Sequence, residues 1–486
     1  FFSLVALTLG TFFLLTSFLR RRTTGKLPPG PAPWPVVGNL FQLGSNPHQS
    51  LAKLAKIYGP LFGLRFGQIY TVVISSPDLA REVLQKHDQA LSGRMSVEAT
   101  RSFDHEKMSI GFLPAGDLWR NLRKLLKEQM MTSPRLEASR PLREARLKKL
   151  LEYLNKSCDE GSSVDITDAA FVTTMNLMWT TFFSSELMQF DSGGSGEFRE
   201  TIKGITNVFG APNLADYFPI LGPLDPQGIR RKARFHMGKL LDLFGNIIDE
   251  RLRERSSQQS SKKQDLLEVL LDLRESSAYQ LTNNDIRHLF LDLFVGGSAT
   301  TAMSIEWTMT ELLRSPSILK RTQDEMRNLK DQIQESDLPK LPYLQALIKE
   351  VFRYHPAGPL LIPHRSESNV EIKGCTIPQH TQIMINIWAM GRDETIWSNP
   401  DVFDPERFID KKIDFKGRDF ELIPFSAGRR ICPGIPLAIT MFPMAVVTFI
   451  HDFDWKLEAG VTPEMIDVGE KFGLALHKLT PLKAIP

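Results

Sequence analysis

The 486 residues of this chain are 42% hydrophobic and 24% charged, so the chain is long enough to bury a large core around a cofactor. Fifty-nine Lys and Arg residues balance 56 Asp and Glu residues to a net charge of +3, which gives no sign of nucleic-acid binding. The three cysteines, Cys158, Cys375 and Cys432, lie far apart in the sequence. This spacing excludes a disulfide framework and a cysteine zinc site, and it is typical of a reducing compartment.

The first segment, Phe1–Leu19, is almost wholly apolar, and Arg20, Arg21 and Arg22 follow it directly. A helix of this length, rising about 1.5 Å per residue, spans the hydrocarbon core of a bilayer. The arginines indicate that the rest of the chain lies on the cytosolic side. A cleaved signal peptide is the alternative, but the apolar run is long and no small-residue cleavage site follows it. We therefore expect a single-pass transmembrane anchor over residues 1–19, with membrane lipid as a partner.

Residues 20–36 are basic and rich in proline. Closely spaced prolines favour extended polyproline II backbone and exclude helix. We interpret this stretch as a stiff hinge between the anchor and the body, although an ordinary linker has the same composition. No internal repeat or change of composition follows, so residues 37–486 are predicted to form one catalytic domain.

The body is predicted to be mainly helical, with small β-sheets at its edges. Most of residues 77–355 follows a helical pattern, with interruptions at 192–196 and 256–264. The segments with strand-like alternation are residues 61–75, 358–390 and 453–486.

Two pairs of donors in this body can bind an acidic group. Trp119 and Arg123, one turn apart on a predicted helix, share a face. His364 and Arg365 lie together in a strand-like segment. In isolation each pair is also typical of plain surface packing.

The predicted helix over residues 285–314 contains Gly296 and Gly297. Each glycine costs about 1 kcal/mol relative to alanine inside a helix. A cofactor plane or ligand pressed against the helix would offset this cost, and close packing against a second helix is the alternative. Thr300 can bond to the carbonyl four residues earlier and widen the helix, which would open a groove for dioxygen and a water.

Glu350 and Arg353 are spaced to pair on a helix, where an exposed pair contributes only about 0.2–0.5 kcal/mol. The surrounding helix is apolar, so the pair is expected to be partly buried and to need further partners. Arg407, upstream of the last cysteine, can complete a Glu–Arg–Arg network that holds the cysteine loop in place.

The loop around Cys432 has what a thiolate ligand to haem iron needs. Gly428 and Gly434 let the backbone approach a flat macrocycle, and Arg430 offers a fork of donors to a haem propionate. A helix starting after Gly434 is expected to lower the pKa of the thiol, and Phe425 to shield the sulfur. A structural cysteine in a Gly/Pro turn is the alternative, but the full F-x-x-G-x-R-x-C-x-G spacing is far more specific.

In this order and spacing, these elements resemble the cytochrome P450 superfamily of haem-thiolate monooxygenases, from the proline-rich hinge to the C-terminus. The resemblance implies a single P450 fold, mainly α with small β-sheets, behind an N-terminal transmembrane helix. It implies haem b as the cofactor, with Cys432 as the axial iron ligand. The implied propionate ligands are Trp119, Arg123, His364 and Arg430, and the implied structural triad is Glu350, Arg353 and Arg407.

The anchor and hinge resemble those of microsomal members, which implies a protein of the endoplasmic reticulum membrane with a cytosolic catalytic domain. Electrons would come from NADPH through NADPH–cytochrome P450 reductase, docked on the cysteine side. Residues 46–49, 215–221 and 225–228 further resemble plant terpenoid oxidases of the ferruginol-synthase-like group, which act on abietane diterpenes.

The resemblance implies that O2 hydroxylates a small apolar substrate, with an abietane-type diterpenoid favoured and a geraniol-type monoterpenoid as the alternative. Apolar segments from five parts of the chain are expected to contact it, although each residue also suits a plain core position. The candidate residues are Phe103, Ile110, Phe112, Phe209, Leu293, Phe294, Gly296, Gly297, Leu360, Leu361, Phe472 and Leu474.

One position departs from the family pattern, because Ala299 stands where an acidic residue usually precedes the threonine. Dioxygen cleavage consumes two protons, so a relay through Thr300 must here use water, Ser298 or a substrate hydroxyl. We expect weak coupling unless a substrate hydroxyl helps or Ala299 is an engineered change. Loss of the acid keeps open a haem-thiolate isomerase or dehydratase that needs no reductase, but the retained Thr300 and the anchor favour a monooxygenase over this enzyme and over a haem carrier.

Overall fold

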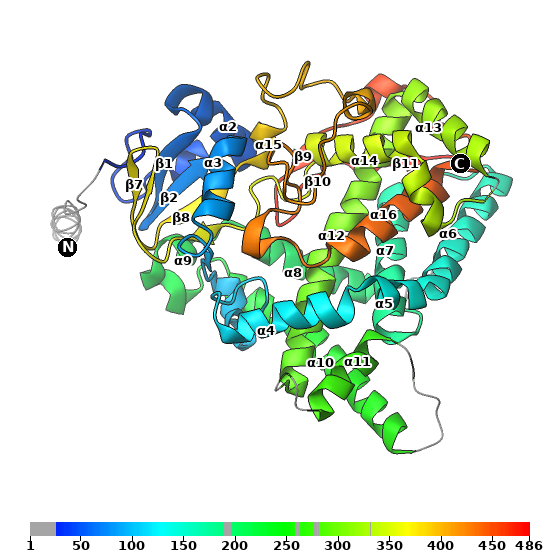
Figure 1. The fold of residues 1–486 in the computed structure, drawn as a ribbon, viewed down its shortest axis with the longest axis horizontal. Coiled ribbons are helices and arrows are strands. Elements are labelled where there is room, and N and C mark those ends of the chain that lie inside the picture. Colours follow the sequence, from blue (N-terminus) through cyan, green and yellow to red (C-terminus); the bar gives the residue numbers. More distant parts are fainter. Residues whose placement is uncertain are drawn as a thin grey trace.

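A long helix, α12 (Asn283–Arg314), runs through the middle of the molecule (Figure 1). Thr282 begins it with a reciprocal cap, in which its hydroxyl accepts from Asp285 N at 3.1 Å and its own N–H donates to the Asp285 carboxylate at 2.8 Å. Pro316 follows the end of the helix after one residue. The computed structural model describes residues 26–187, 190, 196–257, 263, 265–276, 279, 281–330 and 332–486.

Helices make up most of the described chain, as the sequence predicts. The other α-helices are α2 (Pro47–Tyr58), α3 (Pro77–Arg81), α4 (Asp117–Leu125), α5 (Ser133–Ala138), α6 (Arg140–Glu160), α7 (Ile166–Phe183), α8 (Gly196–Gly210), α9 (Leu214–Tyr217), α10 (Ile229–Ser256), α11 (Leu266–Glu275), α13 (Pro316–Leu329), α14 (Pro342–Tyr354), α15 (Ile387–Met390) and α16 (Ile435–Ile450). The short 3-10 and π segments are η1 (Leu40–Gln42), η2 (Glu82–Lys86), η3 (Glu98–Lys107), η4 (Leu126–Met130), η6 (Pro219–Leu224), η7 (Glu335–Lys340), η8 (Pro405–Phe408), η9 (Gly428–Arg430) and η10 (Pro463–Met465).

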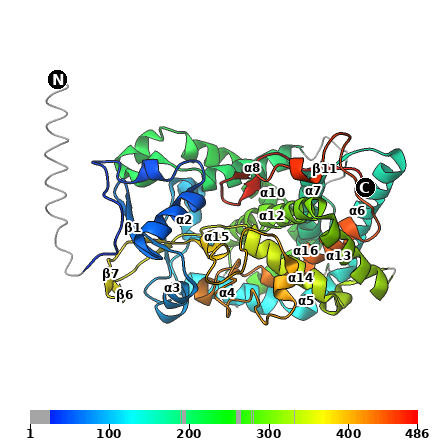
Figure 2. The same cartoon turned by 90° about the horizontal axis from the view of Figure 1, so that it is seen from above.

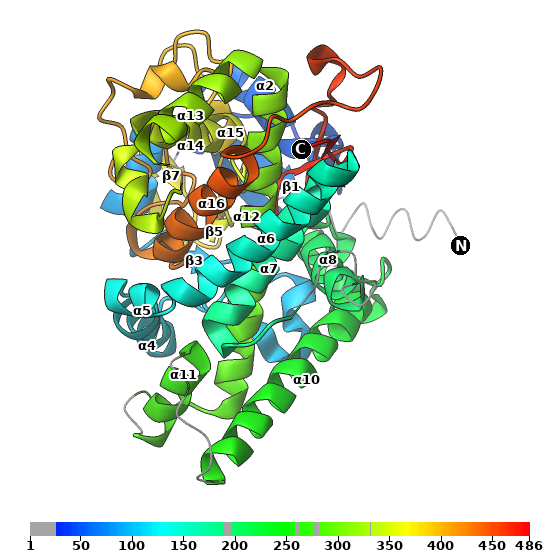
Figure 3. The same cartoon turned by 90° about the vertical axis from the view of Figure 1, so that its right-hand side faces the viewer.

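Helices surround α12 on several sides and form the main core with it. Figure 3 shows α6, α7 and α16 alongside one another, and α12 packs against both α7 and α16. The helices α8 and α10 also pack against α12, and in Figure 2 they lie on the side away from α14. The core between α7, α10 and α12 is rich in stacked and edge-on phenylalanines.

A five-stranded sheet lies at the edge of this helical body, with strand order β1-β2-β8-β5-β3. β2 pairs with β8 in parallel and the other neighbours are antiparallel, so strands from both ends of the chain meet here. The β-strands are β1 (Leu61–Phe66), β2 (Ile69–Ile74), β3 (Gly93–Arg94), β4 (Val164–Asp165), β5 (His364–Arg365), β6 (Val370–Ile372), β7 (Cys375–Ile377), β8 (Gln382–Ile385), β9 (Glu470–Lys471), β10 (His477–Lys478) and β11 (Lys483–Ala484).

The described part of the proline-rich stretch lies against this sheet. The Pro29 carbonyl accepts a hydrogen bond from Gly63 N of β1 at 2.7 Å, while the Lys26 carbonyl accepts one at 2.8 Å from Thr376 N of β7, which belongs to the separate β6–β7 pair. Within the described residues, no helix is both long enough and apolar enough to cross a bilayer. The predicted anchor over residues 1–19 lies outside the described residues, as do most of the predicted interruptions at 192–196 and 256–264.

Candidate haem site

The loop that carries Cys432 leads into α16 and lies close to Leu84 of η2. Gly428 has a φ of +65°, and a Cβ there would lie 1.9 Å from the carbonyl oxygen of Leu84, so only glycine fits. Cys432 N donates to the Phe425 carbonyl at 2.9 Å. Gly434 caps the start of α16, and a Cβ there would meet the Cys432 Sγ at 3.7 Å. Gly428 thus allows the loop to approach Leu84 closely, and Gly434 places no side chain against the sulfur.

The electrostatics of Cys432 correct one sequence prediction. Burial raises the pKa of the Cys432 thiol, and this effect exceeds the opposing one from the backbone N–H groups of Gly434 and Ile435 and the charge of Arg123. The helix start does act in the predicted direction, but it is outweighed. The protein groups alone thus favour the neutral thiol, and a metal cation bound at the sulfur would favour the thiolate.

The Phe425 ring packs edge-on against Phe352, with ring centroids 5.2 Å apart, and it also contacts Phe415. This aromatic cluster covers the inner side of the cysteine loop.

Arg430 of the cysteine loop is accompanied by two arginines from other segments, Arg94 of β3 and Arg123 of α4. The Arg430 guanidinium lies 4.4 Å from the centre of the Trp119 ring and that of Arg123 lies 5.7 Å from it. Burial and the charge of Arg430 lower the pKa of Arg94 to about 9. Burial and the charges of Arg123 and Arg429 lower the pKa of Arg430 to about 10. Among the described residues no carboxylate forms an ion pair with Arg94, Arg123 or Arg430, and the charge of Glu367 offsets only part of the effect of burial and of the neighbouring arginines on the pKa of Arg430.

His364 lies beside this group of arginines. In the pairing of β3 with β5, His364 lies directly opposite Arg94. The His364 Nδ1–H donates to the Leu91 carbonyl at 2.8 Å, while Nε2 is buried and has no hydrogen-bond partner within the described chain. Burial and the charge of Arg94 hold the His364 pKa well below its usual range. An anion placed here would raise that pKa and pair with Nε2.

The predicted propionate donors Trp119 and Arg430 are paired with the main chain in the structure. The Trp119 indole N–H donates to the Ile110 carbonyl at 3.1 Å. Arg430 donates through Nε to the Ser92 carbonyl at 2.9 Å, and through Nη2 to the Leu113 carbonyl. The cluster as a whole nevertheless fits a haem, because two propionates would supply the negative charge that its arginines and the Nε2 atom of His364 lack.

The two glycines of α12 that lie just before Thr300 have different surroundings. A Cβ on Gly296 would meet nothing within 4 Å, whereas one on Gly297 would lie 2.7 Å from Cε of Met178 on α7. Gly297 is therefore explained by close helix packing, and Gly296 leaves room beside the helix. Thr300 Oγ1 donates to the Gly296 carbonyl at 2.7 Å, which is the bond that the sequence predicts.

The two residues before Thr300 face away from this open side. The Ser298 hydroxyl is fully buried and has no hydrogen-bond partner among the described residues. Ala299 is buried in a small cluster with Trp307, Ala475 and Leu476. Their role in a proton relay remains a prediction.

The structure brings Glu350, Arg353 and Arg407 together. Glu350 Oε1 accepts from Arg353 Nη2 at 2.7 Å and from Arg407 Nε at 3.0 Å. Arg353 also donates to the Pro400 carbonyl at 2.8 Å, and Arg407 donates to the Ser398 carbonyl at 2.8 Å. The triad therefore ties α14 to the segment that precedes the cysteine loop.

Several of the predicted substrate residues lie close together. Phe112 packs edge-on against Phe209, with ring centroids 6.0 Å apart. The next residue on α8, Gly210, touches the backbone of Leu474, which would lie 2.1 Å from a Cβ at that position. Phe472 packs against the small cluster that contains Leu360. Ile110 and Leu293 are buried in the main core, and Leu361 is half-buried beside the sheet core with a φ of +52°.

Two of the predicted substrate residues lie elsewhere. Phe103 is 39% exposed, and its ring contacts Arg234 and Gly238 on α10, because the left-handed backbone at positions 103 and 104 turns the side chain outward. Phe294 is fully buried and packs with Phe182 and Phe244 in the aromatic core. Their positions favour a structural role for both.

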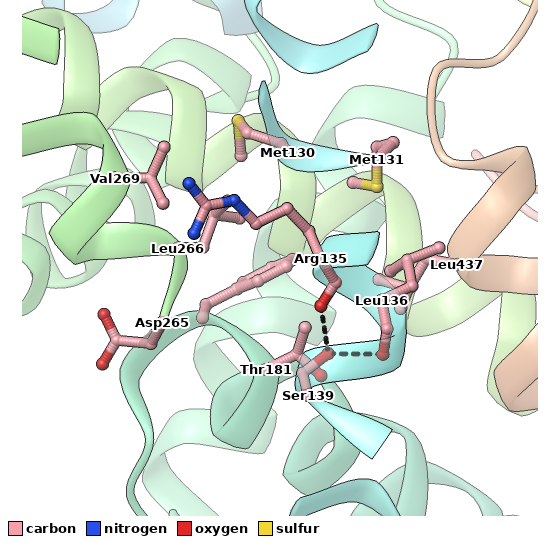
Figure 4. Close-up of a pocket in the computed structure, with 11 residues that line it drawn as sticks. Met130, Met131, Arg135, Leu136, Ser139, Thr181, Asp265, Leu266, Val269 and Leu437 are labelled. Carbon is pink, nitrogen blue, oxygen red and sulfur yellow. Dashed lines mark hydrogen bonds between the residues drawn. The ribbon is translucent and has the colours of Figure 1, made fainter. Parts of the chain in front are cut away.

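A small cavity between η4, α5, α7, α11 and the start of α16 does not suit a substrate. It has a volume of about 20 Å³, which holds roughly one water molecule. Figure 4 shows its lining, in which the Ser139 hydroxyl donates to the carbonyls of Arg135 and Leu136. The labelled lining residues are Met130, Met131, Arg135, Leu136, Ser139, Thr181, Asp265, Leu266, Val269 and Leu437.

Arg94 is the site residue that sequence reasoning missed. It lies in a two-residue strand, and no neighbouring residue in the sequence indicates a role at the haem site. It reaches the site only because β3 pairs with β5, which lies some 270 residues further along the chain. The signal that would have found it is the long-range strand pairing.

Comparisons with known proteins agree with this site. The family described as Cytochrome P450 matches residues 28–482. The chain is 50% identical to a ferruginol synthase of Salvia miltiorrhiza, over 97% of this chain and 95% of that protein. It is 46% identical to a sugiol synthase of the same plant, over 100% and 99% of the two chains, and 45% identical to a carnosic acid synthase of Rosmarinus officinalis, over 96% and 94%. The chain is therefore a haem-thiolate monooxygenase that uses haem b and takes electrons from NADPH through a reductase, and it belongs to the cytochrome P450 family.

Proposed function

We propose that this monooxygenase hydroxylates an abietane-type diterpenoid. The observation that carries the proposal is the full-length similarity to proteins named ferruginol synthase, sugiol synthase and carnosic acid synthase. Among the predicted substrate-lining side chains, Ile110, Phe112, Phe209 and Leu474 are apolar and buried or half-buried. An unfunctionalised hydrocarbon substrate is compatible with such a lining, since it needs no charged partner.

Each part of the site has a definite task in this reaction. When bound, the haem supplies dioxygen activation and insertion of one oxygen atom into a C–H bond. Cys432 would bind the iron, while Arg94, Arg123, Arg430 and His364 would hold the propionates. The room beside Gly296 admits dioxygen, and the neighbouring threonine hydroxyl holds a proton donor there.

We also propose that the protein is anchored in the endoplasmic reticulum membrane with its catalytic domain in the cytosol. Large apolar side chains are exposed on two neighbouring segments, with Phe41 at 80%, Ile220 at 81% and Leu224 at 73%. The β1–β2 turn joins these segments, because its N–H groups donate to the carbonyls of Val37 and Tyr217. Such a patch suits contact with lipid beside a membrane anchor. Microsomal fractionation tests this: carbonate-resistant sedimentation is expected, and recovery in the soluble fraction would contradict it.

The substrate proposal is tested with the purified full chain. Abietatriene, an aromatic abietane hydrocarbon, and geraniol are titrated separately while the haem spin-state spectrum is recorded. Tighter binding of abietatriene, with reductase-dependent hydroxylation, is expected. Preference for geraniol would support the monoterpenoid alternative instead, and turnover without reductase or O2 would support an isomerase or dehydratase.

Reduction under carbon monoxide provides the control for haem ligation. The red-shifted Soret band of a thiolate-ligated haem is expected for the native chain and should be absent in Cys432→Ala.

A further inference from the structure

A buried polar cluster joins the loop after η3 to the central helix, and it takes no part in the chemistry described above. Asp292 on α12 accepts a hydrogen bond from the Ser109 hydroxyl at 2.7 Å through Oδ1, and one from Ile110 N at 2.7 Å through Oδ2. Its carboxylate is only 11% exposed. A buried carboxylate with two donors from one loop is a specific attachment point.

Two buried histidines complete this cluster. His105 Nδ1 and His288 Nδ1 share a hydrogen bond of 2.8 Å, and the two rings stack with centroids 5.1 Å apart. His105 Nε2 lies 3.1 Å from Asp292 Oδ1, without the alignment of a hydrogen bond. The His105 ring also lies 6.2 Å from the ring of Phe209. The cluster therefore connects η3, α8 and α12.

The attachment fixes a tight turn that carries predicted substrate contacts. Phe112 N donates to the Ser109 carbonyl at 3.2 Å and Leu113 N donates to it at 2.8 Å. Gly111 N donates to the Ser109 hydroxyl at 3.1 Å. Because Ser109 and Ile110 are held by the central helix, the side chains of Ile110 and Phe112 are held with them.

The same residue, Ile110, also connects this turn to the propionate side of the site. Its N–H is bound by Asp292, while its carbonyl accepts from Trp119 Nε1 at 3.1 Å and from Arg430 Nη1 at 3.5 Å. A shift of the Ile110 peptide would therefore move both the substrate turn and the donors beside the haem.

We propose that Asp292 is a positioning residue that sets substrate selectivity, by holding the turn from Ser109 to Phe112 between the central helix and the propionate cluster. This inference rests on the proposed function for its substrate, but its main contact can be measured without one. Asparagine cannot replace the carboxylate, because it offers one acceptor oxygen and its NH2 group would face a donor.

The first measurement is hydrogen exchange of the segment 105–113 in the substrate-free holoenzyme. Asp292→Asn is expected to speed exchange of the Ile110 amide at least tenfold, because the amide loses its acceptor. Ser109→Ala removes the hydroxyl bonds to Asp292 and Gly111 but leaves the Ile110 amide its carboxylate acceptor, so it should give a smaller change in the same direction at that amide. Asp242→Asn is the matched control, since Asp242 is an exposed acid on α10 that pairs with Arg287. Exchange unchanged in Asp292→Asn would overturn the inference.

The second measurement is the affinity for abietatriene and for geraniol, from the spin-state titrations. The positioning role predicts that Asp292→Asn lowers the ratio of the two affinities at least fivefold while the thiolate Soret band is retained. The effect of Asp292→Asn combined with Ser109→Ala should be smaller than the sum of the two single effects, because the two residues share one bond. A parallel loss for both ligands would indicate general destabilisation and overturn the selectivity role.

The two proposals fail in different ways. If the native chain binds neither terpenoid, the proposed function fails, and the exchange measurement still decides the role of Asp292. If Asp292→Asn does not fold with haem, Ser109→Ala carries both measurements, and no change in either would refute the inference.

Discussion

Substitution of Glu350 by glutamine removes the only carboxylate that the structure places between Arg353 and Arg407 among the described residues. Glu350 is fully buried and accepts four hydrogen bonds, from Arg353 Nε and Nη2, from Arg407 Nε and from Asp404 N. Glutamine keeps one acceptor oxygen, but its NH2 group must face an arginine donor. Both guanidinium groups then stay buried with main-chain carbonyls as their partners.

The expected loss of stability is large for one substitution. Breaking a buried ion pair by removing one partner costs about 3–5 kcal/mol, whereas the whole unfolding free energy of a typical domain is about 5–15 kcal/mol. Glu406→Gln is the matched control. Glu406 pairs with Arg321 at the surface on the neighbouring turn, where an ion pair is worth about 0–1 kcal/mol.

The assay is urea unfolding of the holoenzyme, followed by tryptophan fluorescence. Trp397 is buried beside the triad, with its ring centre 5.8 Å from the Arg353 guanidinium, so its emission reports on this region. The thiolate Soret band is followed in parallel, because the triad supports the segment that leads to the cysteine loop. If Glu350→Gln and Glu406→Gln unfold within about 1 kcal/mol of each other, the reasoning from a buried network is wrong.

Three further predictions follow from the structure. Gly428→Ala should abolish the thiolate Soret band, since its Cβ would overlap the Leu84 carbonyl. Gly374→Ala is the control and should retain the band, because Gly374 has a similar φ of +71° but no atom within 4 Å of a Cβ. Equal spectra for the two variants would refute the steric argument. Ala299→Asp should lower the hydrogen peroxide released per NADPH by at least about twofold, because it adds a proton donor to the relay, and an unchanged peroxide yield would exclude that relay. Burial and the second histidine lower the pKa of His288 to about 4, below its ordinary 6.5. Folding thus favours the neutral form of His288, so the free energy of unfolding should fall as the pH drops from 6.5 to about 4, by up to about 1.4 kcal/mol per pH unit. In urea unfolding, His288→Asn should flatten this dependence on pH. An equal slope in the variant and the native chain would contradict the assignment of the slope to His288.

The parts of the fold that sequence reasoning predicted are those with a strong local signal. The central helix has a cap, a long apolar pattern and a proline after its end, and its predicted span of 285–314 differs from the observed one only at the start. The hairpin of β1 and β2 forms where strands are predicted, with Gly67 at its turn, but both strands are buried almost throughout and do not show the predicted alternation. The glycine spacing around Cys432 was informative because the loop must approach Leu84 closely, which is a local steric requirement.

The parts that sequence reasoning missed depend on distant segments meeting in space. Arg94 and His364 become neighbours only through strand pairing, and Asp292 meets Ile110 only because the loop after η3 folds over the central helix. An acid inside an apolar helix gives no local sign of its partner, since its donors are a hydroxyl 183 residues earlier and a main-chain N–H 182 residues earlier. What such an acid does indicate is that a partner must exist, because a buried carboxylate without donors is too costly to retain. Buried charges in apolar helices are therefore the residues whose partners are worth seeking first in a chain of this kind.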